Sequence, residues 1–298
     1  MKRIIALLLA VGMCLSLAAC AAPAATQEPT QTAAAETAAP EATPAADATA
    51  APAEESPFRI GLECNYAPFN WTQTEQTQSS VPIFEGGYAD GYDIQVAKII
   101  AAGLGRELEV HKIEWDGLIP ALLAGKIDAI IAGMSPREDR KVSIDFSEPY
   151  YTSDLVIVVK KDGAYASAAS LQDFSGAKIV GQLNTVHDTV IDQIPDVQHQ
   201  TPMDTFPAMI VALTSGKVDG YVSERPGAIS AVAANPNLTF VAFEQGNGFE
   251  ASPGDIAIAV GLPKGSDHAK IDEIISGISE DQRIEMMQTA LANQPLSE

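Results

Sequence analysis

The sequence predicts an α/β fold with two similar lobes, and two observations support this. From Pro57 onward, short β-rich runs alternate with helical runs, which is typical of α/β proteins. A motif also occurs twice: residues 125–129 read Gly-Lys-Ile-Asp-Ala and residues 216–220 read Gly-Lys-Val-Asp-Gly. Each copy follows an apolar helical run, and the copies lie 91 residues apart. We therefore expect two lobes with one sheet each; a common helix-to-strand turn is the alternative explanation of the motif.

The elements of the first lobe follow from local patterns. A β-rich run predicts a strand over 58–62, and a helical run that ends at glycine predicts a helix over 93–103. Alternating polarity predicts a strand over 107–113. Asp116 is expected to cap a helix that runs to residue 124, and the apolar run over 126–132 predicts a buried strand.

The second half repeats this alternation. Its predicted elements are a strand over 155–159, a Gly/Ala/Ser-rich connection over 163–170, a strand over 178–180, a helix from about residue 186, a helix over 206–214 and a strand over 218–222. Ligands of open α/β sheets bind beyond the carboxyl ends of the strands. We therefore expect the ligand chemistry at residues 133–135 in one lobe and 223–225 in the other.

Charge and cysteine content exclude two classes of protein. The chain has 298 residues, with 18 Lys and Arg against 39 Asp and Glu, a formal net charge of −21. This acidic excess repels phosphate backbones and argues against nucleic acid as a partner. Of the three cysteines, Cys14 and Cys20 lie in a segment that looks processed, so Cys64 remains alone in the globular part and a disulfide scaffold is excluded.

The N-terminus has the pattern of an export signal. Two basic residues open the chain, and an apolar run over 4–17 follows that is too short for a permanent membrane span. We expect residues 1–19 to be a signal peptide. Its end, Leu-Ala-Ala followed by Cys20, resembles the lipobox of bacterial lipoproteins, which implies cleavage before Cys20 and its lipidation with fatty acyl chains such as palmitate. The alternative is ordinary cleavage at an Ala-x-Ala-like site, which leaves a free cysteine.

Residues 20–56 are predicted to be a tether. Residues 21–56 include 16 Ala, six Thr and five Pro and no Lys, Arg or aromatic residue. Such a segment has too little apolar surface to offset the entropy cost of ordering, so we expect it to be disordered. A short Ala-rich helix is the alternative, but the prolines interrupt it.

Five segments together carry a family resemblance. They are residues 62–69 (Leu-Glu-Cys-Asn-Tyr-Ala-Pro-Phe), 91–93 (Gly-Tyr-Asp), 115–122, 132–140 and 144–151. In this order and spacing they resemble the extracellular solute-binding proteins of family 3, the polar amino-acid receptors of ABC importers. The resemblance covers about residues 57–295.

The resemblance implies a two-lobed periplasmic-binding-protein-like fold of type II, with a ligand cleft between the lobes. Two crossover strands would join the lobes near residues 151–160 and 243–258. Lobe 1 would then be discontinuous, about 57–155 and 250–298, and lobe 2 would take about 160–243.

A free amino acid carries a carboxylate and an ammonium, so its site needs a fixed cation and a fixed anion. We expect Ser135 and the following proline to open a helix with Arg140 about one turn in. The resemblance places the carboxylate clamp at Arg140, within the motif that begins at Gly133 and Ser135. A surface arginine paired with Glu138 or Asp139 is the alternative.

The resemblance assigns the ammonium to Glu224, at the end of the second copied strand. The alternative for Glu224 is a salt bridge to the neighbouring Arg225. Tyr66 and Trp115 correspond to the aromatic walls around the ligand side chain, and core packing is their alternative.

Glu63 matches the family position whose acid contacts the distal polar group of the ligand. An acid there suits a guanidinium, an ammonium or an amide and opposes a second carboxylate. The sequence therefore favours arginine or lysine before glutamine, with cystine also compatible.

One segment departs from the family pattern. Where the family commonly reads Gly-Thr-Thr or Gly-Thr-Ser, residues 184–186 read Asn-Thr-Val. Thr185 can still donate to the ligand carboxylate, but Val186 has no hydroxyl. Gln182 and His187 flank this loop within reach of the ligand, and a solvated surface position is the alternative for His187.

No enzyme motif is recognisable: the chain lacks a Gly-x-Ser-x-Gly elbow, a Walker loop, a His-Glu-x-x-His helix and a metal-spaced Cys/His cluster. Cys64 is expected to be a small buried cysteine, and we expect no cofactor and no metal. Phe69 and Trp71 are expected in the core.

We expect a substrate-binding lipoprotein that captures a free amino acid by lobe closure. Its expected partners are the permease and ATPase of an ABC importer. Its expected place is the cell surface, or the periplasmic face if an outer membrane exists, anchored through Cys20. A dehydratase-type enzyme on the same fold and a ligand-binding sensor protein are the alternatives.

Overall fold

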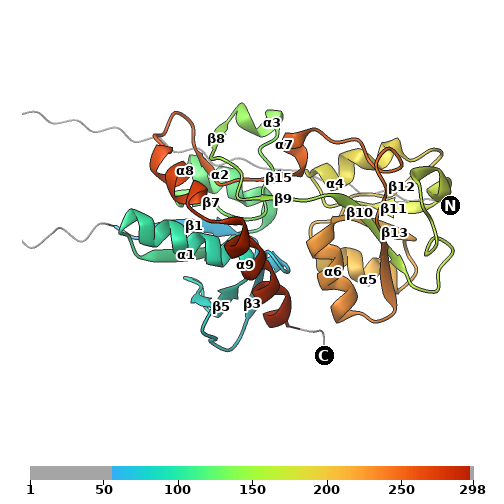
Figure 1. Ribbon diagram of the computed structural model, residues 1–298, viewed down its shortest axis with the longest axis horizontal. Coiled ribbons are helices and arrows are strands. Elements are labelled where there is room, and N and C mark those ends of the chain that lie inside the picture. Colours follow the sequence, from blue (N-terminus) through green and yellow to red (C-terminus); the bar gives the residue numbers. More distant parts are fainter. Residues whose placement is uncertain (1–55, 296–298) are drawn as a thin grey trace, which may run out of the picture. The chain divides into compact units, whose positions relative to one another are not determined.

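The computed structural model describes residues 56–295, and Figure 1 shows their helices and strands. The predicted signal peptide, Cys20 and nearly all of the predicted tether lie outside the described residues. The described part contains two five-stranded mixed sheets, one in each lobe.

The sheet of lobe 1 has the strand order β6-β1-β7-β16-β8. Its strands are β1 (Phe58–Leu62), β6 (Leu108–Lys112), β7 (Ala129–Ile130), β8 (Ile144–Phe146) and β16 (Gly261–Pro263). β1 runs parallel to β6 and β7, and β16 runs antiparallel to β7 and β8. The register pairs Phe58 with Leu108 and Ile60 with Ala129.

The sheet of lobe 2 has the order β12-β11-β13-β10-β14. Its strands are β10 (Leu155–Lys160), β11 (Lys178–Val180), β12 (Gln198–His199), β13 (Gly220–Glu224) and β14 (Leu238–Val241). β11 runs parallel to β12 and β13, and β10 runs antiparallel to β13 and β14. In both sheets, three adjacent strands run parallel and the next strand runs in the opposite direction. The predicted α/β class with two similar lobes is therefore confirmed.

Two short crossover strands lie between the two sheets. β9 (Tyr151–Thr152) and β15 (Ala257–Ile258) pair antiparallel and run between the two groups of elements in Figure 1. Both lie within the ranges expected for the crossovers. A four-stranded sheet of β2 (Asn65–Tyr66), β3 (Asn70–Gln73), β4 (Val81–Pro82) and β5 (Tyr88–Asp90) extends from lobe 1.

Helices cover both sheets. The helices of the first half are α1 (Tyr92–Leu104), η1 (Trp115–Gly117), α2 (Leu118–Leu123) and α3 (Glu138–Lys141). Those of the second half are η2 (Leu171–Phe174), α4 (Val186–Thr189), η3 (Val190–Gln193), α5 (Phe206–Thr214), α6 (Arg225–Ala234), α7 (Pro253–Ile256), α8 (Ala269–Ser276) and α9 (Glu280–Asn293). α8 and α9 return to lobe 1 and pack against α1.

The duplicated motif forms the same junction in both lobes. Gly125 and Gly216 end their helices with φ of 67° and 79°, in the left-handed region that glycine favours. In each copy the aspartate accepts a hydrogen bond from the backbone N–H of the neighbouring strand: Arg59 donates to Asp128 Oδ2 at 3.1 Å, and Lys178 donates to Asp219 Oδ2 at 2.9 Å. The motif is therefore a connector between adjacent strands and not only a turn.

Several predicted elements differ in extent. The apolar run over 126–132 forms a ladder only at Ala129–Ile130, because the residues before it belong to the glycine junction and those after it leave the sheet toward the loop at Gly133. The helix expected to open at Ser135 begins at Glu138, and Arg140 lies inside its single turn. Strand β13 begins two residues later than predicted and continues to Glu224.

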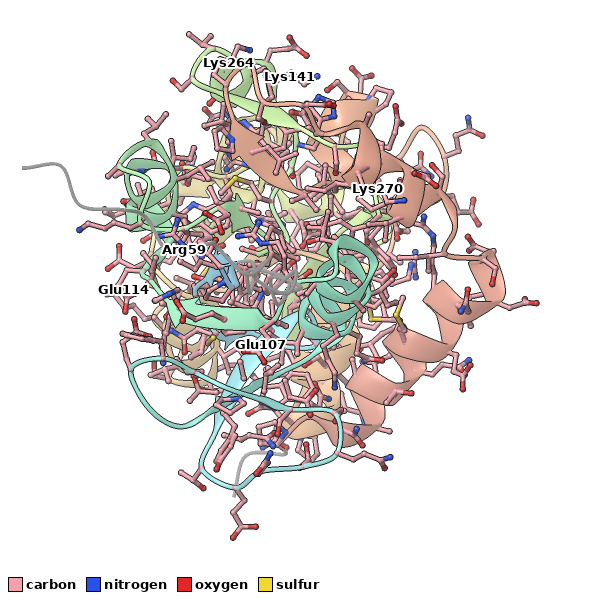
Figure 2. All side chains as sticks on the ribbon, turned by 90° about the vertical axis from the view of Figure 1, so that its left-hand side faces the viewer. Arg59, Glu107, Glu114, Lys141, Lys264 and Lys270 are labelled. Atoms are coloured by element: carbon pink, nitrogen blue, oxygen red, sulfur yellow. The ribbon has the colours of Figure 1, made fainter. Side chains whose placement is uncertain are left out.

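The core residues include those predicted. Phe69, Trp71 and Cys64 are buried in a large apolar cluster. The same cluster contains Tyr66 and, from lobe 2, Phe206. Burial raises the pKa of the Cys64 thiol to about 12, so the thiol stays protonated and is a poor nucleophile. At the surface of lobe 1, a long polar side chain links two segments of the chain. Lys264 Nζ donates to the carbonyl of Lys141 at 2.7 Å, and both residues are labelled in Figure 2.

Candidate functional site

The predicted site residues follow the carboxyl ends of parallel strands in both lobes. Glu63 follows β1, Trp115 follows β6, and Gly133 and Ser135 follow β7. In lobe 2, Gln182 and Thr185 follow β11, and Glu224 ends β13. Hydrogen bonds, described below, connect the two sets across the lobes.

Arg140 is a buried cation that reaches both lobes. Its side chain is only 8% exposed, although it lies on a short surface helix. Nη1 donates to the carbonyl of Ser135 at 2.9 Å, and Nη2 donates to the carbonyl of Asn184 in lobe 2 at 2.9 Å. Among residues 56–295 no carboxylate forms an ion pair with Arg140; Asp139 pairs with Arg137 instead. The alternative of a surface arginine is therefore wrong.

Burial makes this cation costly. Burial, followed by repulsion from Arg137, lowers the pKa of Arg140 to about 10. The guanidinium remains charged at neutral pH and retains hydrogen-bonding capacity for an anion.

A cavity of about 400 Å³ adjoins Arg140. Trp115 lies in its wall, with its ring centroid 5.1 Å from Arg140 Cζ, so the aromatic face offsets part of the guanidinium charge. Lobe 2 contributes Asn184 and Thr185 to the wall. Glu63, Tyr66 and Glu224 are not among the residues that line this cavity.

The hydroxyls expected to meet the ligand carboxylate are occupied by backbone acceptors. Ser135 Oγ donates to the carbonyl of Asp255 at 2.9 Å, and Thr185 Oγ1 donates to the carbonyl of Gln182 at 2.7 Å. Gly133 has φ of 63°, and a Cβ there would lie 3.0 Å from Tyr66 Cε1. The glycine is therefore required by both its backbone conformation and the position of the Tyr66 ring.

Glu224 faces His187. Both side chains are buried, at 2% and 4% exposure, and His187 Nε2 lies 3.0 Å from Glu224 Oε2. Burial raises the pKa of Glu224 to about 8. The alternative salt bridge from Glu224 to Arg225 is wrong, because Arg225 pairs with Asp154. The solvated position considered for His187 is also wrong, since Phe206 packs edge-on against its ring at 5.4 Å.

Glu63 is held by lobe 2. Gln182 Nε2 lies 3.2 Å from Glu63 Oε2 and also donates to the carbonyl of Asp204 at 3.0 Å. Burial raises the pKa of Glu63 to about 7, although the Gln182 amide lowers it in part. An acid in this state gains most from a cationic partner, which stabilises its ionised form.

Tyr66 stacks on Phe206 of lobe 2, with ring centroids 4.3 Å apart and an interplanar angle of 9°. Sequence reasoning assigned Tyr66 to a wall with Trp115 and missed Phe206, which begins α5 after the N-cap Thr205. The sequence did contain a signal for Phe206, because it is an aromatic residue at the predicted start of a helix.

Three buried polar atoms at this place have no aligned hydrogen-bond partner: Tyr66 Oη, His187 Nε2 and Glu224 Oε2. Buried polar atoms are rarely left unpaired without a functional reason. Three such atoms lie here: a hydroxyl, an imidazole nitrogen and a carboxyl oxygen.

The sequence model of the bacterial extracellular solute-binding proteins, family 3, matches residues 58–290. The chain belongs to this family. Membership agrees with the two mixed sheets and the paired crossover strands. The family's description places its members outside the cell.

Curated relatives of this family 3 member bind several amino acids. A probable histidine-binding protein of Campylobacter jejuni is 33% identical over 195 residues, 64% of this chain and 70% of the relative. The arginine-binding extracellular protein ArtP of Bacillus subtilis is 33% identical over 129 residues, 43% of this chain and 45% of the relative. The L-cystine-binding protein TcyJ of Escherichia coli is 26% identical over 179 residues, 60% of this chain and 63% of the relative.

Solved structures agree with the fold of this family 3 member. A substrate-binding protein of an amino-acid ABC transporter from Streptococcus pneumoniae, bound to L-arginine, is 28% identical with a TM-score of 0.68; the match covers 80% of this chain and 94% of that one. The ancestral amino-acid-binding protein AncCDT-1, a precursor of cyclohexadienyl dehydratase, is 26% identical with a TM-score of 0.64, over 79% and 95% of the two chains.

No helix within residues 56–295 is both long and apolar enough to cross a bilayer. No group of three or more His, Cys, Asp or Glu side chains in this part of the chain could hold a metal ion.

Proposed function

We propose that this chain is the substrate-binding lipoprotein of an amino-acid ABC importer. It captures a free polar or basic L-amino acid between its lobes and delivers it to a membrane permease with its ATPase. Residues 1–19 direct export, lipidated Cys20 holds the protein at the membrane surface, and residues 20–56 are the tether. Lobe 1 takes about 57–155 and 250–298, and lobe 2 about 160–243.

One observation supports the proposal most strongly: Arg140 is a buried guanidinium with no ion pair in the described chain, held between the two lobes. A buried cation without a counter-charge is destabilising, and a ligand carboxylate would supply the missing charge. Glu224, buried at the end of β13, would receive the ammonium of the same ligand. Only a closed arrangement satisfies both ligand charges, so binding favours closure.

The ligand class follows from Glu63. Its burial and its present partner, an amide, suit a distal guanidinium, ammonium or amide and oppose a second carboxylate. We therefore rank arginine and lysine before glutamine, with cystine also included. The relatives that bind arginine, histidine and cystine support this range.

A thermal-shift screen of the twenty amino acids plus ornithine, citrulline and cystine tests the proposal. A ligand at about 100 times its dissociation constant stabilises the folded state by about 2.7 kcal/mol, which a melting curve resolves. Arginine or lysine should give the largest shift and glutamate the smallest. A protein that no amino acid stabilises would not be an amino-acid receptor.

The role of Glu63 has a matched control. Glu63→Gln should reduce arginine binding more than glutamine binding, since only the cation needs the carboxylate. Glu114→Gln removes an exposed carboxylate whose charge acts on Glu63 (Figure 2) and should change both affinities little. Calorimetry measures both affinities. If the two substitutions changed them equally, Glu63 would not determine the ligand specificity.

The structural similarity to AncCDT-1 supports one other candidate function, that of a dehydratase acting on a prephenate-like acid. An ultraviolet assay with prephenate separates the two functions. Turnover would favour the enzyme, whereas stabilisation by an amino acid without turnover favours the receptor.

A further inference from the structure

His187 occupies the position next to the proposed ammonium site, and its hydrogen bonds determine where its proton lies. Thr185 Oγ1 lies 2.7 Å from the carbonyl of Gln182 and 3.2 Å from His187 Nδ1. A carbonyl oxygen only accepts hydrogen bonds, so the single hydroxyl hydrogen of Thr185 points to Gln182. The hydrogen between Thr185 and His187 must then belong to Nδ1.

This assignment leaves His187 Nε2 as a bare acceptor while the imidazole is neutral. Burial keeps the imidazole neutral by lowering the pKa of His187 to about 3, and the positive charges of Arg140 and Arg137 act in the same direction. The atom opposite Nε2 is Glu224 Oε2, at 3.0 Å. Neither atom has an aligned hydrogen-bond partner within the described residues. Two bare acceptors at this distance repel each other, so the pair favours a proton on the carboxyl or a donor from a ligand.

Before a ligand binds, burial and this repulsion both favour a protonated Glu224. A protonated Glu224 beside a neutral imidazole leaves no net charge in the pair, which agrees with the raised pKa of Glu224 of about 8. The charged groups that act on the pair are Arg140 and Arg137 from the segment that contains α3; Arg225, the next residue after Glu224, is neutralised by Asp154.

We propose that His187 is a positioning residue for the proposed ammonium site: it presents a bare nitrogen beside Glu224, so that the ligand ammonium binds by replacing the carboxyl proton of Glu224. The ammonium has three N–H donors and no acceptor, and it satisfies both Nε2 and the ionised Oε2. Charge balances, because one cation enters and one proton leaves to solvent. This inference rests on the proposed function for the identity of the ligand but not for the protonation state of the empty pair.

Nuclear magnetic resonance of the ligand-free, full-length protein tests the pair directly. With ¹⁵N-labelled histidine, His187 should show a protonated Nδ1 and a bare Nε2 and should not become an imidazolium between about pH 5 and 8. With ¹³C-labelled glutamate, Glu224 should ionise well above the ordinary glutamate range of about 4.3. An Nε2 proton on His187, or ordinary titration of either residue, would overturn the proposal.

His187→Gln separates positioning from simple packing. A glutamine amide can rotate to donate to the carboxylate, which the bare imidazole nitrogen cannot do, so the pKa of Glu224 should fall by about one unit or more. His187→Phe keeps the ring volume without the acceptor and should leave Glu224 protonated at neutral pH. Equal Glu224 titration in both variants would mean that His187 only fills space.

Calorimetry with L-arginine in buffers of different ionisation enthalpy measures the number of protons released on ligand binding. Wild-type protein at neutral pH should release a larger fraction of a proton than His187→Gln, because Glu224 is more fully protonated in the wild type. Any proton released at Glu63 is common to both proteins and cancels in the difference. If no amino acid binds, the proposed function fails in this arm, while the resonance experiment still decides the state of His187 and Glu224.

Discussion

At the scale of single residues, burial determines the chemistry of the site. Arg140 keeps its charge although burial lowers its pKa, and Glu63 and Glu224 hold their protons more tightly than exposed carboxyls because burial raises theirs. The same side chains on an open surface would be solvated and would have little preference for one ligand over another. Under the proposed function, a zwitterion supplies the opposite charges, and relief of the burial cost contributes to its affinity.

The geometry of Arg140 gives a prediction at this scale. Arg140→Lys keeps the charge but loses the planar fork that reaches both Ser135 and Asn184. We expect amino-acid affinity to weaken by about 2–5 kcal/mol, the usual cost of breaking a buried hydrogen-bonded charge pair. Arg225→Lys is the control, because its partner Asp154 is half exposed. Calorimetry that found wild-type affinity in Arg140→Lys would contradict the carboxylate clamp.

At the scale of elements, the two copies of the glycine junction differ in their side-chain partners. Asp128 accepts from the backbone of Arg59 and also pairs with the guanidinium groups of Arg59 and Arg106 (Arg59 is labelled in Figure 2). Asp219 accepts from the backbone of Lys178. The copy in lobe 1 therefore contributes more electrostatic stabilisation.

Substitution of the two aspartates tests this difference. Asp128→Asn should destabilise the protein by about 1–2 kcal/mol, since hydrogen bonds to charged groups are lost at a partly exposed site. Asp219→Asn, the matched control, should cost less. Urea denaturation measures both, and equal costs would show that the arginine pairs contribute nothing.

The pH dependence of the same site has a defined sign. Burial alone would raise the pKa of Asp128, but hydrogen bonds and charge from Arg59, followed by Arg106, lower it overall. A lowered folded-state pKa means that the stabilisation is present above the unfolded-state pKa and is lost as the pH falls through the folded value. Asp128→Asn should therefore lose less stability than wild type on acidification.

At the scale of the whole described unit, side-chain contacts join the two lobes. Arg140 donates to Asn184, Gln182 donates to Glu63, and Tyr66 stacks on Phe206. These contacts occupy groups that the proposed ligand needs. We infer that the proposed ligand must compete with these contacts, so that their strength affects its apparent affinity.

Phe206→Ala tests this competition. Loss of the Tyr66 stack should open the ligand-free protein, which small-angle scattering detects as a larger radius of gyration, and a bound amino acid should reverse the change. Phe243→Ala is the control, because Phe243 packs against Phe174 and Phe249 within lobe 2. An unchanged radius in Phe206→Ala would mean that this stack does not hold the lobes together.

The sequence by itself determined the fold class, the family and most strand positions. Strands over 58–62 and 178–180 and the helix over 206–214 have the predicted bounds, because apolar runs and cap residues are local signals. The repeated Gly-Lys-x-Asp motif indicated two similar lobes because the same junction needs the same residues. The burial of Cys64 also followed from its local surroundings.

Only the tertiary structure decided the partners of the site residues. Phe206 stacks on Tyr66. Gln182 donates to Glu63, which lies 119 positions earlier in the sequence. His187 is buried against Glu224 and is not exposed. No local pattern encodes these contacts, because they form between elements that are distant in the sequence and that only tertiary packing brings together. The protonation of Glu63, Glu224 and His187 depends on the same packing, since removal from water is what shifts each pKa.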